Sequence, residues 1–125
     1  MAGTVRELIA EQIKADSPTY VVKPYAAAKP EVEKPTVYVY RETLTNSPQT
    51  ASVMSELKVA LMVPGLPSVA NENALEDFLY DVLVSINALN FTQWSKAERT
   101  TFFESYSGYE ISVQANTENI YKPSA

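Results

Sequence analysis

Apolar residues recur every three or four positions in two stretches of the chain, which is the spacing of an amphipathic helix. The first stretch covers residues 4–15, where Thr4 and Glu7 have the spacing of a capping box. In the second, residues 71–89, Asn71 and Asn73 are the candidate N-caps. We expect its apolar stripe to cover one face of a sheet; the stripe consists of Leu75, Phe78, Leu79, Val82, Leu83, Ile86 and Leu89.

Strands are predicted where β-branched and aromatic residues are dense. The clearest strand covers residues 36–45, TVYVYRETLT, and a short β-prone run precedes it at residues 19–22. The pattern of residues 52–63 fits a helix or a strand. The turn at residues 46–48 and the Pro64-Gly65 pair favour the second arm of a β-hairpin.

Residues 97–116 are predicted to form another hairpin. Ser95 and Glu98 have the spacing of a capping box, which favours a helix, whereas the β-rich run at residues 99–103 favours a strand. Beyond the turn at Gly108, apolar and polar residues alternate as in a half-buried strand: Tyr109, Ile111, Val113 and Ala115 on one face, and Glu110, Ser112 and Gln114 on the other.

The predicted order is α-β-β-β-α-β-β in a single domain of 125 residues. Hairpins interrupted by helices indicate an α+β fold. We therefore expect an antiparallel or mixed β-sheet of four to five strands with two main helices packed on one face. The proline-rich residues 23–35 are predicted to form a plain connector or an arm that docks on a neighbouring subunit, and residues from about 117 a loosely held tail.

Composition excludes several classes of function. The chain contains no His and no Cys, which rules out Ser-His-Asp and Cys-His catalytic sites and zinc sites built from these ligands. Its glycines, Gly3, Gly65 and Gly108, cannot form a phosphate-binding loop. We expect no cofactor, no metal and no enzymatic activity. No signal peptide or apolar run long enough to span a bilayer is apparent, so we expect a soluble protein.

The charge balance disfavours a direct nucleic-acid reader. Ten Lys and Arg against fifteen Asp and Glu give a net charge of −5, and the lysines are scattered. Binding to a phosphate backbone depends on clustered cations. An acidic surface that faces DNA without gripping it remains compatible with this composition.

Two arrangements of residues still merit testing as catalytic groups. Asp77 and Asp81 lie four residues apart on one predicted helix face, where a carboxylate pair can act as acid and base or bind Mg²⁺ or Ca²⁺. A solvated helix surface is the explanation that we favour for them. Ser95 and Lys96 contain the groups of a Ser-Lys dyad, although adjacent side chains usually diverge.

Aromatic residues indicate interaction surfaces instead. The chain has eight tyrosines, a residue type enriched at protein interfaces because it combines apolar area with a polar tip. Tyr38 and Tyr40 share one face of their strand, and Val37 and Val39 share the other. If helices cover only one face, the second face carries aromatic surface on which the protein can assemble.

The whole layout resembles the tail terminator proteins of long-tailed (siphovirus-type) bacteriophages, over roughly residues 4–116. The segments that carry the resemblance are the helix VRELIAEQI, the strand TVYVYRETL, a second strand ending at VPG, the acidic-capped helix NENALEDFLYDVLVSINAL and the closing WSKAERTTFFESYSGYEISV. A protein of this family is expected in the neck region of the virion, after synthesis in the host bacterial cytoplasm.

The resemblance implies a hexameric ring on the head-proximal end of the tail tube. Such a ring stops tube polymerisation and presents a surface to the head-completion (connector) protein, while DNA passes through its lumen without specific binding. Its expected partners are further copies of the chain, the tail tube protein and that connector protein, with no membrane involved. We expect subunit contacts at the sheet edges and the proline-rich segment, with Tyr25, Tyr38, Tyr40 and Arg41 as candidates.

Two alternatives remain. A tail tube subunit or a head–tail stopper is another virion component with related demands, although the strong helix at residues 71–89 disfavours the β-rich tube subunit. A small carboxylate-based enzyme or ligand-binding domain is the third class, and a polar pocket holding two carboxylates would favour it.

Overall fold

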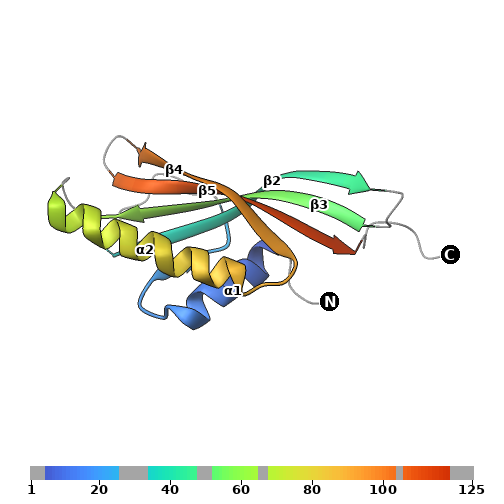
Figure 1. The fold of residues 1–125 in the computed structure, drawn as a ribbon, viewed down its shortest axis with the longest axis horizontal. Coiled ribbons are helices and arrows are strands. Elements are labelled where there is room, and N and C mark those ends of the chain that lie inside the picture. Colours follow the sequence, from blue (N-terminus) through green and yellow to red (C-terminus); the bar gives the residue numbers. More distant parts are fainter. Residues whose placement is uncertain (1–4, 26–33, 48–51, 65–67, 104–105, 119–125) are drawn as a thin grey trace.

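A computed structural model describes residues 5–25, 34–47, 52–64, 68–103 and 106–118. The chain has an α+β fold, with two helices and a five-stranded mixed sheet in the predicted order (Figure 1). The elements are α1 (Val5–Asp16), β1 (Val21–Lys23), β2 (Thr36–Ser47), β3 (Ser52–Val63), α2 (Val69–Asn87), β4 (Thr92–Phe102) and β5 (Tyr106–Glu118).

The strands lie side by side in the order β1-β2-β3-β5-β4. The β1–β2 pair is parallel and very short, and all other neighbours are antiparallel. Both predicted hairpins, β2–β3 and β4–β5, are therefore confirmed. The ladder between β3 and β5 joins the two hairpins at the centre of the sheet, across the whole length of both strands.

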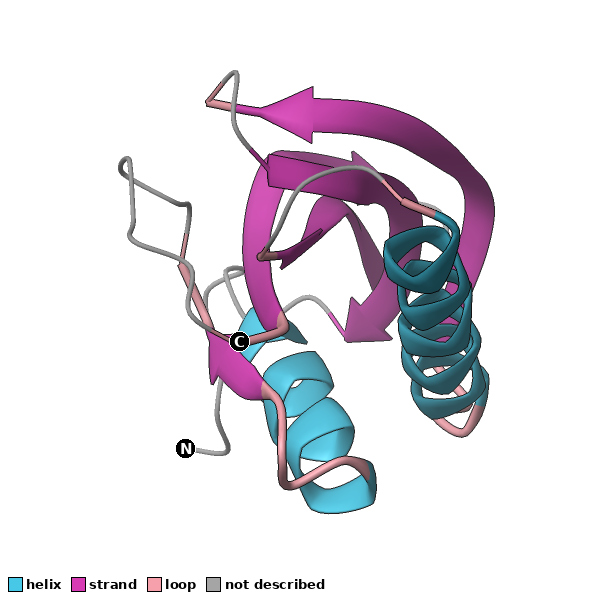
Figure 2. Ribbon diagram, turned by 90° about the vertical axis from the view of Figure 1, so that its left-hand side faces the viewer, coloured by secondary structure: helices cyan, strands magenta, loops and turns pink. Residues whose placement is uncertain are grey.

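Both helices pack on one face of the sheet, as expected from the amphipathic patterns. Phe78, Ile86 and Ile13 are almost fully buried against strand residues that include Val39, Val59 and Ile111. Burying a side chain of this size contributes roughly 1.5–3 kcal/mol. Figure 2 shows the twisted sheet curving over the two helices.

Polar contacts fasten α2 to the segment that follows α1. The hydroxyl of Tyr20 donates to Oδ2 of Asp81 at 2.6 Å, and its ring lies 4.4 Å from that of Phe78. Ser85 donates to Oδ2 of Asp16 at 2.8 Å. The hydrogen bonds that Asp16 receives from Gln12 and Ser85 lower the pKa of its carboxyl group.

The N-cap predicted for the second helix was wrong. Helix α2 begins two residues before Asn71, and Ser68 is the N-cap: its extended backbone lets its hydroxyl accept the backbone N–H of Asn71 at 3.1 Å. Asn73 lies within the helix and is exposed. The capping-box spacing of Ser95 and Glu98 does not start a helix either, because both residues lie in β4.

Strand β5 extends to Glu118, two residues beyond the predicted end of the hairpin. The predicted tail therefore begins inside a strand, and its remainder lies outside the described residues. Most of the proline-rich segment lies outside them too. Its described start is held by Arg6, whose Nε donates to the carbonyl oxygen of Pro24 at 2.8 Å.

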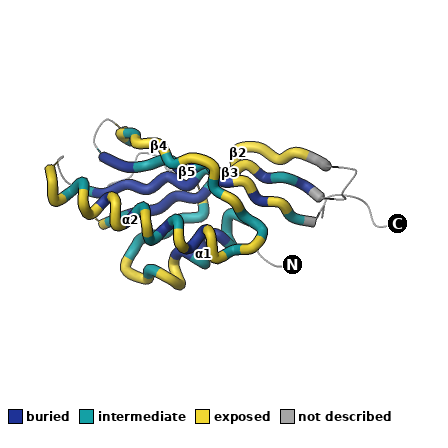
Figure 3. The backbone as a smooth tube through the Cα atoms, in the orientation of Figure 1, coloured by how far each residue is buried: buried dark blue, intermediate teal, exposed yellow. Residues whose placement is uncertain are grey.

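The far ends of β2, β3 and β5 project beyond the helices (Figure 1). In β2, the residues from Arg41 to Thr45 are exposed (Figure 3). A β-bulge interrupts the pairing of β2 with β3 at Glu42, and another interrupts the pairing of β4 with β5 at Ser95. Bulges increase the local twist of a strand, and here they lie in the two strands that form the long edges of the sheet.

Candidate functional site

The face of the sheet opposite the helices, which we call the open face, is the candidate site. One end of it is apolar: Tyr38, Ala60 and Met62 are buried there, with Phe102 and Tyr106 packed against them. No helix residue belongs to this cluster within the described part of the chain. The side chains of the sheet therefore cover this end of the face themselves.

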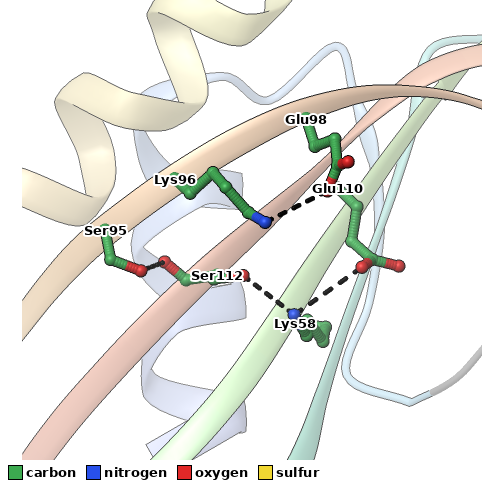
Figure 4. A network of polar contacts seen from close by, with 6 residues as sticks. All are labelled: Lys58, Ser95, Lys96, Glu98, Glu110 and Ser112. Carbon is green, nitrogen blue, oxygen red and sulfur yellow. Dashed lines mark hydrogen bonds and ion pairs between the residues drawn. The ribbon is translucent and has the colours of Figure 1, made fainter.

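The rest of the open face carries a group that we call the charged row: Lys58, Lys96, Glu98, Glu110 and Ser112. Lys58 donates to Oγ of Ser112 at 2.8 Å and lies 3.7 Å from Glu110 (Figure 4). Lys96 lies 3.3 Å from Glu98. The two lysines lie at one level of the strand register and the two glutamates at the next, so the charged row has no net positive charge. It therefore lacks the clustered cations that binding to a phosphate backbone requires.

Tyr40 borders the charged row, because it pairs with Lys58 in the register of β2 and β3. Its phenol is half-buried. Burial, and then the carboxylates of Glu110 and Glu42, raise its pKa above the ordinary value of 10.0. Tyr40 therefore stays neutral at physiological pH and can donate a hydrogen bond to an acceptor on a partner.

The structure places the four candidate interface residues in three different environments. Tyr40 borders the open face, whereas Tyr38 is buried there and only 6% exposed. Tyr25 is 54% exposed, and its ring lies edge-on 6.1 Å from that of Tyr38. Arg41 pairs with Leu57 in register and so belongs to the helix side of the sheet, where it is exposed. Tyr38 is therefore too buried to contact a partner directly, whereas Tyr25, Tyr40 and Arg41 remain accessible candidates.

Three of the four side chains considered for catalysis make other polar contacts. Asp81 accepts the hydrogen bond from Tyr20, and Asp77 is exposed on α2. Ser95 donates to the carbonyl oxygen of Ser112 at 3.4 Å, while Lys96 pairs with Glu98. Among the described residues, no three acidic side chains converge as they would to hold a metal ion.

An open depression of about 440 Å³ lies where the α2–β4 connection meets the far ends of β3 and β5. It is lined by Met54, Asn90, Phe91, Thr92, Gln93, Gln114 and Asn116. The lining holds amide, hydroxyl and apolar groups and none that ionises near neutral pH. The two-carboxylate pocket that would favour an enzyme is thus not found at this depression.

Sequence reasoning identified part of the open face. The alternation of Glu110 and Ser112 with apolar residues signalled that they share an outward face, and the structure confirms it. The pairing of Lys58 with these residues was missed, because the period of residues 52–63 was ambiguous. Glu42 was also missed, since nothing in the local pattern reveals that a bulge places it at an edge.

No helix in the described residues is long and apolar enough to cross a membrane. No protein-family model matches this chain, and no curated protein sequence is significantly similar to it.

Proposed function

We propose that this chain is a structural virion protein, a tail terminator that forms a hexameric ring on the head-proximal end of a bacteriophage tail tube. The ring stops polymerisation of the tube and joins it to the head-completion protein, and DNA passes through its lumen. The protein acts through its surfaces and is not an enzyme.

One observation supports the proposal: among the described residues, the helices cover a single face of the sheet, and no helix covers the open face or the projecting strand ends. A closed ring needs two different patches on each subunit, which meet around the circle. An asymmetric sheet with helices on one side offers such patches. The net charge of −5 and the balanced charged row suit a lumen that lets DNA slide.

The test is to disrupt the gene in the phage that encodes this chain and to examine its tails by electron microscopy. We expect overlong tubes without heads, because only length control fails. A wild-type copy supplied in trans should restore normal tails.

The other outcomes separate the alternatives. Absence of tails would assign the chain to the tube or its initiation complex. Tails of normal length that do not join heads would indicate a head–tail stopper. Infectious particles of normal appearance would exclude a virion function.

A further inference from the structure

Within the described part of the chain, the outer edge of β2 is unpaired over most of its length and that of β4 over all of it. β1 covers only Thr36–Tyr38 of β2, which leaves the outer edge of β2 open from Val39 to Ser47. β4 pairs with β5 on one side only. Unpaired backbone N–H and C=O groups along such an edge are a template for another strand. The two edges lie on opposite sides of the sheet and differ in sequence.

The strand directions make these edges complementary. β2 is antiparallel to β3, β3 to β5, and β5 to β4, so β4 runs opposite to β2. If a second copy continued the sheet, its β2 would meet β4 of the first copy in the antiparallel sense. This is the direction in which strands pair through the more favourable pattern of hydrogen bonds.

Continuing the sheet also restricts the register, because the open faces of the two copies must lie on the same side of the joined sheet. Glu42 is exposed and follows Tyr40 by two residues, the spacing at which side chains of a strand share a face, so we assign it to the face of Tyr40. A register that places Glu42 next to Lys96 places Tyr40 next to Glu98. The first pair is an ion pair, and in the second the neutral phenol can donate to a carboxylate.

A slip of two residues towards the C-terminal end of β4 keeps the faces aligned but is unfavourable. It sets Glu42 opposite Glu98 and Arg41 opposite Arg99. Like charges directly opposite each other on neighbouring strands are destabilising. The charges on the two edges therefore favour the register that sets Glu42 beside Lys96 over this slipped one.

We propose that the outer edge of β2 pairs antiparallel with β4 of a second copy of this chain, with Glu42 of one copy beside Lys96 of the next. This inference rests on the proposed ring and supplies the contact between its subunits. The bulges at Glu42 and Ser95 bend the two paired strands, which suits a sheet that curves from one subunit to the next. The contact is heterologous and repeats around a closed circle.

The absence of cysteine from the chain provides a clean test. We would prepare Glu42→Cys together with Lys96→Cys in one chain and oxidise the assembled protein with copper phenanthroline. Within one chain β3 and β5 separate the two positions, by roughly 14 Å at three strand spacings. A disulfide needs Cα atoms within about 7 Å, so any bond formed joins two copies. We expect a ladder of covalent oligomers on a non-reducing gel.

Two controls make the result specific. Mixing the single variants should give covalent dimers and nothing larger. The matched pair Asp77→Cys with Lys96→Cys, which keeps one exposed cysteine on α2, should give no ladder. Circular dichroism melts of every variant would verify folding.

Oligomers that form without a bond between positions 42 and 96 would overturn the edge pairing, and so would a folded protein that stays monomeric at every concentration. The outcome of the gene-disruption experiment does not depend on the outcome of this cross-linking experiment. If gene disruption gives overlong tails and the protein forms rings, but no disulfide joins positions 42 and 96, the terminator function stands and the edge pairing is wrong. If the ladder of covalent oligomers forms but gene disruption leaves the tails normal, the edge pairing stands and the terminator function is wrong.

Discussion

Tyr20 fastens α2 to the segment between α1 and β1 through a single polar group. Its hydroxyl donates to Asp81 on α2, and its ring packs on Phe78. Burial, the hydrogen bond to Asp81 and the negative charges of Asp81 and Asp77 raise the pKa of Tyr20 to about 12. The protonated phenol is therefore the form that stabilises the fold.

Replacing Tyr20 by Phe tests this bond. We expect Tyr20→Phe to lower the free energy of unfolding by about 1 to 2 kcal/mol at pH 8, because a hydrogen bond to a charged acceptor is lost. Urea unfolding would measure it. Tyr80→Phe, at a side chain on α2 that is 69% exposed, is the matched control and should change little.

The same pair of proteins gives a pH prediction. The folded pKa is raised from 10.0, so the contribution of Tyr20 is complete below pH 10 and is lost as the pH rises towards 12. The stability difference between wild type and Tyr20→Phe should shrink over this window. A difference that stays constant from pH 8 to 12 would contradict the assignment.

Gly108 is a second residue whose identity the fold requires. A Cβ at this position would overlap the carbonyl oxygen of Leu61 and lie 2.7 Å from the ring of Phe102. We expect Gly108→Ala to destabilise the protein by about 1 to 3 kcal/mol, as overpacking does. Thermal unfolding would show this. Ser112→Ala, on the same strand and face, loses the hydrogen bond from Lys58 but creates no overlap, and is a control that should cost less.

At the scale of elements, the structure differs from the sequence-based prediction at the N-cap of α2. Ser68→Ala removes the acceptor of the Asn71 N–H and should cost about 1 kcal/mol. Asn73→Ala, in the exposed helix interior, should be neutral or slightly stabilising because alanine has the higher helix propensity. Guanidinium unfolding of both variants would distinguish the two N-caps, and the opposite ranking would restore the original one.

The periodic segments were predictable because burial imposes its period on the sequence. Helix α2 and strand β5 are half-buried over most of their length, so Phe78 and Ile86 in one and Ile111 and Val113 in the other mark the inward positions. Strand β3 was ambiguous because the central strand is covered on both faces, with Leu61 and Met62 both fully buried. Alternation then disappears, and only the flanking turns indicate a strand.

The candidate site was harder to predict than the fold. The expectation that Tyr38 and Tyr40 share a face was confirmed, yet Tyr38 is buried by side chains from β3, β4 and β5. The ion pair between Lys58 and Glu110 joins residues of β3 and β5, which α2 and β4 separate in the chain. Such partners depend on strand order and register, neither of which local sequence encodes.

On the scale of the whole molecule, the sheet has a protected centre and two open edges. Amide hydrogen exchange of the unassembled protein should be slowest in β3, which is paired on both sides, and faster in β4. Assembly through the edges should slow exchange around Glu42 and Lys96. Exchange in β4 as slow as that in β3 before assembly would contradict an open edge, and mass spectrometry of peptides would measure both strands.

The ladder between β3 and β5 also determines how the chain reaches its native state. Each hairpin can form from residues close in sequence, whereas docking β3 on β5 closes a loop that contains α2 and β4. Loop-closure entropy makes such non-local pairing the slow part of folding. Until it occurs, the apolar strand β3 exposes a free edge to other nascent chains. Helix α2 packs on both strands, so its docking covers one face of β3 as soon as the two hairpins have joined, and exposure of apolar strands to other chains ends at this step.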